Sequence, residues 1–246
     1  MNIVLSLKKA LVRALSSQPE LHGWIRRGYC WLGLGTRTER DFLFALSKRQ
    51  RDIVFVEIGA NDGKTNDPLH YFVKKYRWKG IAVEPVPEIF EKLWGTYQNY
   101  DNVIPVCAAL ADRNGSATFY RVEPGPGVPE SCSFLGSFSR DTLLLHTQRF
   151  PEIHQHVIEQ MVPTITFDTL VEQSGFKRID VIMIDTEGYD YEVLKQIDFR
   201  RFRPILVIYE QIHLTDVEKS ESKRLLETFG YKVHNSYNMN FVAVRA

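Results

Sequence analysis

The sequence predicts an α/β fold built on a doubly wound, mainly parallel sheet. From residue 53 onward, strand-like apolar runs alternate with helix-like segments, an order that is typical of a parallel sheet with helices on both faces. The run 53–58 is apolar except at Glu57 and ends at Gly59, as expected of a buried strand that feeds a ligand-binding turn. A chain of 246 residues is long enough for one sizeable core with a modest appendage.

Composition and charge exclude some classes of protein. The chain is 44% hydrophobic and 25% charged, as in ordinary globular proteins, and its formal net charge of +1 provides no field for nucleic acid. The three cysteines show neither a disulfide framework nor zinc-site spacing, which favours a reducing cytoplasm over secretion. No apolar run approaches the roughly 20 residues of a membrane helix. We therefore expect a cytoplasmic protein without a transmembrane segment or a nucleic-acid partner.

Residues 1–50 are predicted to form a helical extension ahead of the main domain, residues 51–246. Near the amino terminus, apolar residues recur at helical spacing among lysines and an arginine. This pattern favours a helix that packs on the domain or on a second subunit, which would make a homodimer. Peripheral membrane contact through residues 1–20 is the alternative.

The main domain is expected to contain five strands and five helices ahead of a C-terminal hairpin. Pro68 and Pro87 suit the first turns of two helices, and Gly230 ends the last one. Two β-rich pieces in 231–244 predict an antiparallel hairpin at the sheet edge. A further helix, at 37–51, leads into the first strand. The expected strands are 53–58, 80–84, 103–107, 180–185 and 205–210, and the expected helices are 67–77, 87–98, 166–174, 189–196 and 217–229.

Residues 121–163 interrupt this alternation. They begin with a turn-rich stretch, 123–129, and continue through several serines to a predicted helix that carries His146. An insertion here lies beside the carboxyl edge of the sheet, where ligands bind in open α/β folds, so we interpret it as a substrate lid. An oligomer contact is the alternative. We expect His146, His154 and His156 on a solvated helix. Contact between His146 and the substrate is the more specific alternative.

The turn 57–63 after the first strand is the leading candidate for a ligand site. Gly59 lets the backbone turn tightly and approach a ligand, and exposed N–H groups there can hold a carboxylate or a phosphate. Asn61 stands where a dinucleotide fingerprint usually has its second glycine, and its side chain would crowd a pyrophosphate but not an amino-acid carboxylate. Glu57 suits a ligand with an ammonium group. The turn alone indicates a ligand with an anionic or zwitterionic end.

Acidic residues also end three later strands. Glu84 ends the second strand, where an acid can accept both ribose hydroxyls of an adenosine ligand. Asp185 and Glu187 follow the fourth strand, and Glu210 and His213 follow the fifth. Because parallel strands share one carboxyl edge, we expect all of these side chains to face the same crevice as the first turn.

Three strings, 57–65, 80–85 and 184–190, resemble those of the FkbM family of S-adenosylmethionine-dependent methyltransferases. The resemblance extends from about residue 50 to the end of the chain. It implies the class I methyltransferase fold, a Rossmann-like fold with a seven-stranded sheet and an antiparallel last strand. It also implies S-adenosylmethionine as the cofactor and an O-methyltransferase acting on hydroxyls of sugars, glycolipids or polyketide-type products.

The resemblance further assigns the cofactor site residue by residue. The first turn would hold the methionine part, Glu84 the ribose, and segment 106–110, which includes Ala108, the adenine. Asp112 lies close to that segment. Asp185 is expected to bind the ammonium group of the methionine part. The turn residues expected to bind the cofactor are Glu57, Gly59, Asn61, Asp62 and Gly63.

Methyl transfer to oxygen requires alignment of the acceptor oxygen, the methyl carbon and the sulfur, and a base that removes the hydroxyl proton. Glu187, Glu210 and His213 are the candidate catalytic residues. His213 or Glu210 is favoured as the base, because neighbouring groups could tune either one toward neutral pH. The same three residues, together with Asp185, could instead bind a divalent metal through oxygen ligands and one imidazole. The preferred interpretation contains no metal.

Two other classes of function stay open. A nicotinamide-dependent dehydrogenase or epimerase would use a related fold, but the turn lacks the three-glycine spacing and no Tyr-x-x-x-Lys pair follows the fourth strand. A non-catalytic adaptor would bind the cofactor without turnover, although the full set of acidic strand tips favours activity. Among methyl acceptors, the hydroxyl of a sugar, glycan or glycolipid is expected first, and that of a polyketide-like small metabolite second.

Overall fold

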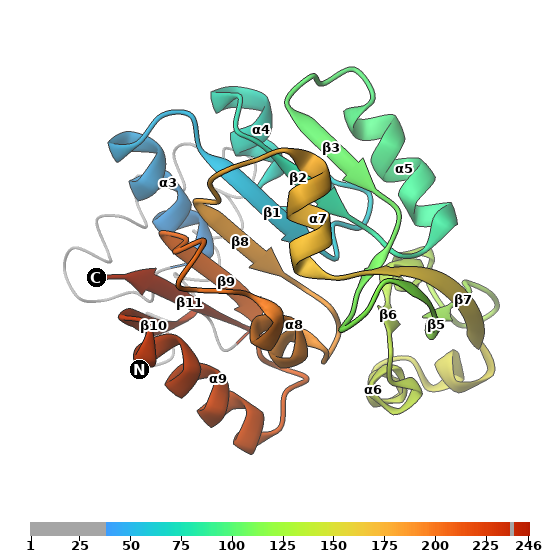
Figure 1. Cartoon of the computed structure of the whole chain (residues 1–246). Helices are drawn as coiled ribbons and strands as arrows, with labels where there is room; N and C mark the ends of the chain where they lie inside the picture. Colours follow the sequence, from blue (N-terminus) through green and yellow to red (C-terminus); the bar gives the residue numbers. More distant parts are fainter. Residues whose placement is uncertain (1–37, 237–238) are drawn as a thin grey trace, which may run out of the picture.

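The computed structural model describes residues 38–236 and 239–246, and its centre is a seven-stranded sheet (Figure 1). The strand order is β10-β11-β9-β8-β1-β2-β3, and the five strands from β9 to β3 pair in parallel. The last strand, β11, pairs antiparallel with both β9 and β10 and therefore lies inside the sheet rather than at its edge. The strands are β1 (Val54–Ile58), β2 (Lys79–Val83), β3 (Val103–Val106), β8 (Val181–Ile184), β9 (Leu206–Glu210), β10 (Tyr231–Ser236) and β11 (Asn240–Arg245).

Helices cover both faces of this sheet, which confirms the predicted doubly wound fold. Successive residues of β1 point to opposite faces: Phe55 packs with the helices α3, α4 and α5, and Val56 packs with α7, α8 and α9 (Figure 1). Proline at the start of α5 and threonine caps at α7 and α9 fix where three of the helices begin. The helices are α3 (Glu39–Arg49), α4 (His70–Tyr76), α5 (Pro87–Tyr97), α7 (Phe167–Ser174), α8 (Asp190–Gln196) and α9 (Asp216–Thr228).

A second, four-stranded sheet, which the sequence analysis did not predict, includes two strands that border the insertion, β5 (Gly115–Val122) before it and β7 (Val157–Ile165) at its end. The long antiparallel pair β5 and β7 forms its centre, flanked by β4 (Ala109–Leu110) and β6 (Gly136–Ser137). In Figure 1 it lies at the right, beside the arrowheads of the parallel strands. Between β5 and β7, the chain forms only short helices: η1 (Glu130–Phe134), α6 (Arg140–Leu144), η2 (Leu145–Gln148) and η3 (Pro151–Gln155).

Helix α3 belongs to the core of the domain, although the sequence places it in the extension. Its residues Leu43 and Leu46 are buried together with Phe55 of β1. The rest of the predicted extension, including the segment 1–20, lies outside the described residues. Within residues 38–236 and 239–246, none of the helices combines the length and the apolar character that a bilayer crossing requires.

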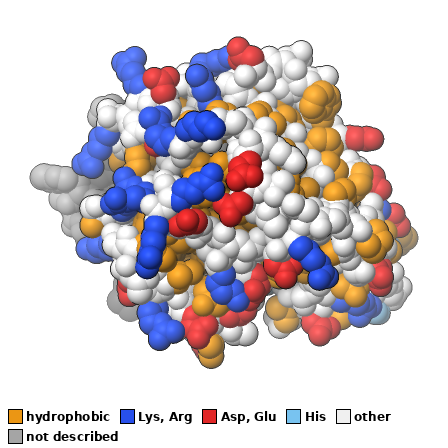
Figure 2. All heavy atoms as spheres, in the orientation of Figure 1, with side chains coloured by type: hydrophobic (Ala, Val, Ile, Leu, Met, Phe, Trp, Pro, Cys, Tyr) orange, Lys and Arg blue, Asp and Glu red, His pale blue; other side chains and the backbone are white. Residues whose placement is uncertain are grey.

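Basic side chains line a hollow at the amino ends of the strands, opposite the expected ligand edge. Figure 2 shows Lys and Arg side chains prominent on the left of the face viewed, interspersed with acidic ones. Asp180 in this hollow is buried and accepts hydrogen bonds from the Val54 amide (2.9 Å) and from Arg178 Nε (3.0 Å). The basic residues that line the hollow are Arg51, Lys177, Arg178, Arg201, Arg203 and Arg245.

Candidate active site

A cleft lies at the carboxyl ends of β1, β2 and β8, where parallel strands direct their following loops to one edge. The space between its walls, counting the part open to solvent, is about 570 Å³. The second sheet forms the opposite wall. The expected cofactor residues that line the cleft are Gly59, Asn61, Glu84, Ala108 and Asp185.

Gly59 is the point of closest approach between the first turn and β8. Its φ is +82°, and a Cβ atom built on it would lie 1.8 Å from the carbonyl oxygen of Asp185. The Gly59 and Ala60 amides donate to the carbonyl of Val83 (3.0 and 2.9 Å), which joins the turn to β2 as well. Only glycine can both adopt this left-handed backbone without strain and leave room for a carbonyl oxygen at this distance. The turn is therefore held against two neighbouring strands.

Glu84 is a buried carboxyl group at the wall of the cleft. Its Oε2 accepts a hydrogen bond from the Asn61 amide (3.1 Å) and its Oε1 from the Val86 amide (3.0 Å). Burial raises the pKa of Glu84 to about 7, against the lowering effect of these two hydrogen bonds. Each carboxylate oxygen has a further lone pair, so the group can also accept hydrogen bonds from a ligand. This arrangement fits the two adjacent hydroxyls of a ribose.

We expect the Glu84→Gln variant to lose part of the pH dependence of stability. Because the folded-state pKa lies above the ordinary 4.5, the folded protein holds more protons than the unfolded chain between about pH 4.5 and 7. The contribution of Glu84 to stability is therefore full below pH 4.5 and is lost as the pH rises to about 7. The free energy of unfolding of Glu84→Gln relative to wild type should rise by about 3 kcal/mol from pH 4.5 to pH 8. Urea denaturation across this range is the measurement.

Glu91→Gln, a substitution of an exposed glutamate on α5, is the control for that series. A difference between Glu84→Gln and wild type that stays constant from pH 4.5 to pH 8 would contradict the assignment of the raised pKa to Glu84.

The apolar part of the cleft suits a flat aromatic ligand group. Val86 and Leu110 line it together with Phe119 of β5, and Phe134 and Phe138 line it from the insertion. The rings of Phe119 and Phe138 lie 5.2 Å apart in an edge-to-face arrangement, which is a favourable geometry for aromatic packing. An adenine between these side chains would be buried. Asp112, which was considered for the adenine amino group, is exposed and does not line the cleft.

Three of the expected cofactor residues support the turn and do not line the cleft. Glu57 lies against Asp67, and its pKa is raised well above 4.5 by burial, by Asp67 and by Asp185. Asp62 accepts hydrogen bonds from the amides of the two residues after Gly63 (3.0 and 2.7 Å). A Cβ atom at Gly63 would collide with Tyr97 of α5. These residues therefore support the turn on the side that faces away from the cleft.

Asp185 has the electrostatic character expected of a group that binds a cation. It lines the cleft, and its pKa is raised well above 3.8 by burial and by the neighbouring carboxyls of Glu187, Asp190 and Glu84. A positively charged ligand group beside it would favour the ionised form. The ammonium group of a bound methionine part is such a group, so the residues of the cleft fit S-adenosylmethionine at its ribose, adenine and amino-acid ends.

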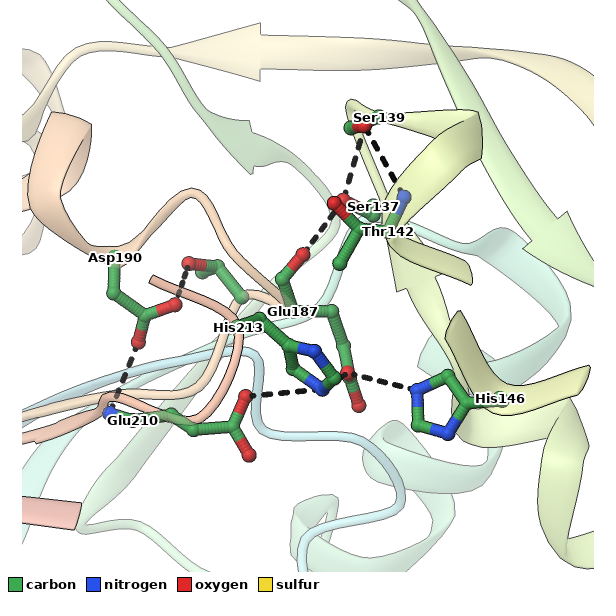
Figure 3. Close-up of polar contacts among 9 residues, drawn as sticks. Ser137, Ser139, Thr142, His146, Glu187, Asp190, Glu210 and His213 are labelled. Atoms are coloured by element: carbon green, nitrogen blue, oxygen red, sulfur yellow. Dashed lines mark hydrogen bonds and ion pairs between the residues drawn. The ribbon is translucent and has the colours of Figure 1, made fainter. Parts of the chain in front are cut away.

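A second group of polar side chains, the polar cluster, adjoins this cleft and consists of His146, Glu187, Glu210 and His213 (Figure 3). His213 Nε2 lies 2.9 Å from Glu187 Oε2 and 3.8 Å from Glu210 Oε2, and His146 Nε2 lies 3.5 Å from the same Glu187 oxygen. Burial alone would raise the pKa of Glu187, but the two imidazoles lower it to about 2. Burial and the neighbouring acids raise the pKa of Glu210 to about 10. The three predicted catalytic residues therefore do lie together.

His146 is the member of the polar cluster that the sequence analysis placed differently. It was expected on a solvated helix, but it lies in the short helix η2 with its side chain turned inward to Glu187. His154 is exposed, and His156 contacts the backbone carbonyl of Glu123. A histidine in a polar segment carries no sequence signal for an inward orientation, because the orientation depends on how the insertion packs.

Two buried residues that the sequence analysis did not single out position the polar cluster. Asp190 accepts hydrogen bonds from Thr186 Oγ1 (2.9 Å) and from the Glu210 amide (3.1 Å), so it joins the tips of β8 and β9. Ser137 Oγ, in the insertion, donates to the backbone carbonyl of Glu187 (2.7 Å). Glu187 has a φ of +49°, an uncommon conformation for a residue other than glycine, and Ser137 helps to hold it.

Comparison with known proteins identifies the family. The model of the "Methyltransferase FkbM domain" matches residues 57–235. The hexuronic acid methyltransferase AglP of Haloferax volcanii is 24% identical over 202 residues, which cover 80% of this chain and 72% of that protein. Two solved methyltransferase structures are also similar. The FkbM methyltransferase of Methylobacillus flagellatus is 12% identical (78% of this chain, 43% of that chain, TM-score 0.47), and a methyltransferase of Geobacter sulfurreducens is 10% identical (98% and 95%, TM-score 0.46).

The family match covers most of the chain and includes the first turn, Glu84, the tips of β8 and β9 and the insertion. Its members are S-adenosylmethionine-dependent methyltransferases, which agrees with the fit of the cleft to that cofactor and does not support a nicotinamide-dependent enzyme. The chain belongs to the FkbM family of S-adenosylmethionine-dependent methyltransferases.

Proposed function

We propose that this methyltransferase acts on a hydroxyl group of a sugar, in a glycan or a glycolipid. The observation that carries the proposal is the polar cluster beside the cofactor cleft, which Glu187 of the cluster helps to line. A hydroxyl must lose its proton as the new bond forms, whereas a carboxylate acceptor would need no base. The name of the relative AglP, a hexuronic acid methyltransferase, supports a carbohydrate acceptor.

The proposed reaction is an in-line displacement. When bound, S-adenosylmethionine supplies a methyl group on a positively charged sulfur. The acceptor oxygen forms a bond to the methyl carbon while the carbon–sulfur bond breaks, and the electron pair of that bond stays on the sulfur of S-adenosylhomocysteine. The hydroxyl proton passes to the polar cluster, where His213 is the proposed acceptor, because Glu210, with a pKa raised to about 10, already carries a proton at neutral pH. Asp185 is proposed to bind the ammonium group and Glu84 the ribose.

The insertion is proposed to complete the acceptor site. Its phenylalanines line the cleft and its residues Ser137 and His146 contact Glu187, so residues 121–163 connect the cofactor cleft with the polar cluster. An acceptor that binds between them would be shielded from water during transfer. This supports the interpretation of the insertion as a substrate lid. The roles proposed for the rest of the predicted extension, residues 1–37, which include membrane contact through 1–20 or a homodimer, concern residues outside the described part of the chain.

The test is transfer of a labelled methyl group from the cofactor to a panel of acceptors. The panel contains glycosides of hexuronic acids, their carboxyl-reduced counterparts, neutral hexosides and hydroxylated polyketide-type compounds. We expect an alkali-stable methyl ether on a sugar hydroxyl, found by mass spectrometry, and retention of activity on the carboxyl-reduced glycosides. Label in an alkali-labile methyl ester or on nitrogen would contradict the proposal.

Two outcomes separate the alternatives that the sequence left open. Transfer only to polyketide-type hydroxyls would assign the acceptor to small metabolites. Tight binding of S-adenosylhomocysteine without transfer to any acceptor in the panel would favour a non-catalytic adaptor. Calorimetry with S-adenosylhomocysteine, run on the same preparation, confirms in each case that the cofactor site is intact.

A further inference from the structure

Three atoms of the polar cluster converge on one point. One ligand atom from each of His146, Glu187 and His213 lies within 4.8 Å of those from the other two. His146 Nε2, Glu187 Oε2, His213 Nε2 and Glu210 Oε2 are buried, and apart from their ion-pair contacts with one another they have no hydrogen-bond partner among the described residues. The side chain of His213 is only 9% exposed. Buried polar atoms normally have partners, so this convergence requires an explanation.

The separations between these atoms fit coordination of one metal ion. Metal–nitrogen and metal–oxygen bonds of about 2.1 Å, set at right angles or at tetrahedral angles, place neighbouring ligand atoms about 3.0 to 3.4 Å apart. The Glu187 oxygen lies 2.9 Å from the His213 nitrogen and 3.5 Å from the His146 nitrogen. Figure 3 shows both imidazoles turned toward that oxygen from opposite sides. Glu210 Oε2 lies 3.8 Å from the His213 nitrogen and does not belong to the group of atoms that lie within 4.8 Å of one another.

The charge around the cluster also favours a cation. Four carboxyl groups, those of Asp185, Glu187, Asp190 and Glu210, lie within electrostatic range of one another. In the part of the chain that the structure describes, no Lys or Arg forms an ion pair with any of them. The positive charge of the cofactor would compensate Asp185, at the methionine end of the cleft. Among the described residues, the ion-pair partners of the carboxyls at the polar cluster are the imidazoles of His146 and His213.

We propose that His146, Glu187 and His213 bind a divalent first-row transition-metal ion. Two imidazole nitrogens among the donors favour Zn²⁺ and related ions over Mg²⁺ and Ca²⁺, which prefer oxygen ligands. The site combines residues from three segments: the insertion, the tip of β8 and the loop after β9. His146 was not among the metal ligands that the sequence analysis considered, and its inclusion is what completes the set.

The proposed ion has a catalytic and a structural role. The catalytic role rests on the proposed function: an ion at this position would bind the acceptor hydroxyl and lower its pKa, so that the proton leaves to water and His213 serves as a ligand in place of the base. The structural role does not depend on the reaction. Because His146 belongs to the insertion, the ion would tie residues 121–163 to the tips of β8 and β9.

The experiment uses the full chain without an affinity tag, stripped with a chelator and titrated by calorimetry with Zn²⁺ and, separately, with Mg²⁺. We expect one Zn²⁺ per chain and no comparable binding of Mg²⁺. His146→Gln and His213→Gln should each weaken Zn²⁺ binding by about 100-fold or more, since loss of a ligand costs at least as much as loss of a group that orients one. His154→Gln, in which an exposed histidine of the same insertion is changed, is the matched control and should bind Zn²⁺ like the wild type.

Two further measurements test the metal site and the proposed function independently of each other. Hydrogen exchange of residues 140–148 should be faster in the stripped protein than in the Zn²⁺-loaded protein, and S-adenosylhomocysteine binding should be retained in both. Absence of Zn²⁺ binding by the folded, stripped chain, or Zn²⁺ binding unchanged in both His146→Gln and His213→Gln, would overturn the metal site. Undiminished methyl transfer by stripped protein would overturn its catalytic role and leave the proposed function standing. A confirmed Zn²⁺ site without transfer to any hydroxyl would support the metal site and contradict the proposed function.

Discussion

Replacement of Gly59 by alanine is expected to lower the free energy of unfolding by about 3 kcal/mol or more and to weaken S-adenosylhomocysteine binding about tenfold or more. The added Cβ atom would lie 1.8 Å from the carbonyl oxygen and 2.8 Å from the carbonyl carbon of Asp185. These are backbone atoms, so a side-chain rotation cannot relieve the overlap, and the φ of +82° is unfavourable for alanine in addition. The turn must move away from β8, and the cleft that both line changes shape.

Urea denaturation and calorimetry with S-adenosylhomocysteine measure the two effects of Gly59→Ala. Gly95→Ala is the matched control, because Gly95 lies in α5 with no atom within 4 Å of the position of an added Cβ. Alanine is the better helix former, so this variant should be unchanged or more stable by up to about 1 kcal/mol. A Gly59→Ala protein with the stability and cofactor affinity of Gly95→Ala would show that the close approach to Asp185 does not shape the site.

The parallel core could be predicted from the sequence because its strands are buried on both faces. Such strands appear as continuous apolar runs, and a change of one or two residues at their ends does not alter the order of elements. The helix expected at 67–77 shows the limit of this reasoning: α4 begins only at His70, because Asp67 uses its side chain to accept a hydrogen bond from the Leu69 amide. Local capping of this kind shifts boundaries but not topology.

The role of Glu57 could not be predicted correctly from its position next to the turn. In a strand, alternate side chains point to opposite faces, so Glu57 points to the same side as Phe55, toward α4 and α5. There it lies against Asp67, and the cleft is left to Gly59 and the residues after it. The position of an acid at the end of a strand identifies an edge of the sheet. The alternation of side chains between the two faces determines which acids can contact the ligand.

The insertion was the least predictable part of the chain. Strand β7 alternates exposed residues, such as Met161, with buried ones, such as Val162, a weaker signal than a continuous apolar run. Its partner β5 lies more than thirty residues earlier, so the pairing depends on how the whole segment folds. The orientation of His146 follows from that pairing. The half of the site that comes from the main domain was therefore visible in the sequence, and the half that comes from the insertion was not.

Replacement of Glu187 by glutamine is expected to lower kcat by about 100- to 10,000-fold, the range associated with loss of proton transfer by a positioned group. The low pKa of about 2 means that Glu187 is ionised at neutral pH, so the substitution removes a full negative charge without changing the size of the side chain. Both imidazoles of the polar cluster lose their shared carboxylate, whether it orients them directly or through a bound ion. Methyl transfer to the acceptor identified by the panel is the measurement.

The same variant also distinguishes the reaction centre from the cofactor site. The contacts of the Glu187 carboxylate are with His146 and His213, whereas the proposed contacts of the cofactor are with Glu84 and Asp185. The dissociation constant of S-adenosylhomocysteine should therefore stay within about fivefold of the wild-type value. Glu192→Gln, at an exposed glutamate of α8, is the matched control and should retain full kcat. If Glu187→Gln instead lost cofactor affinity and kept its kcat, the polar cluster would belong to the cofactor site, and the hydroxyl proton would have to leave by another route.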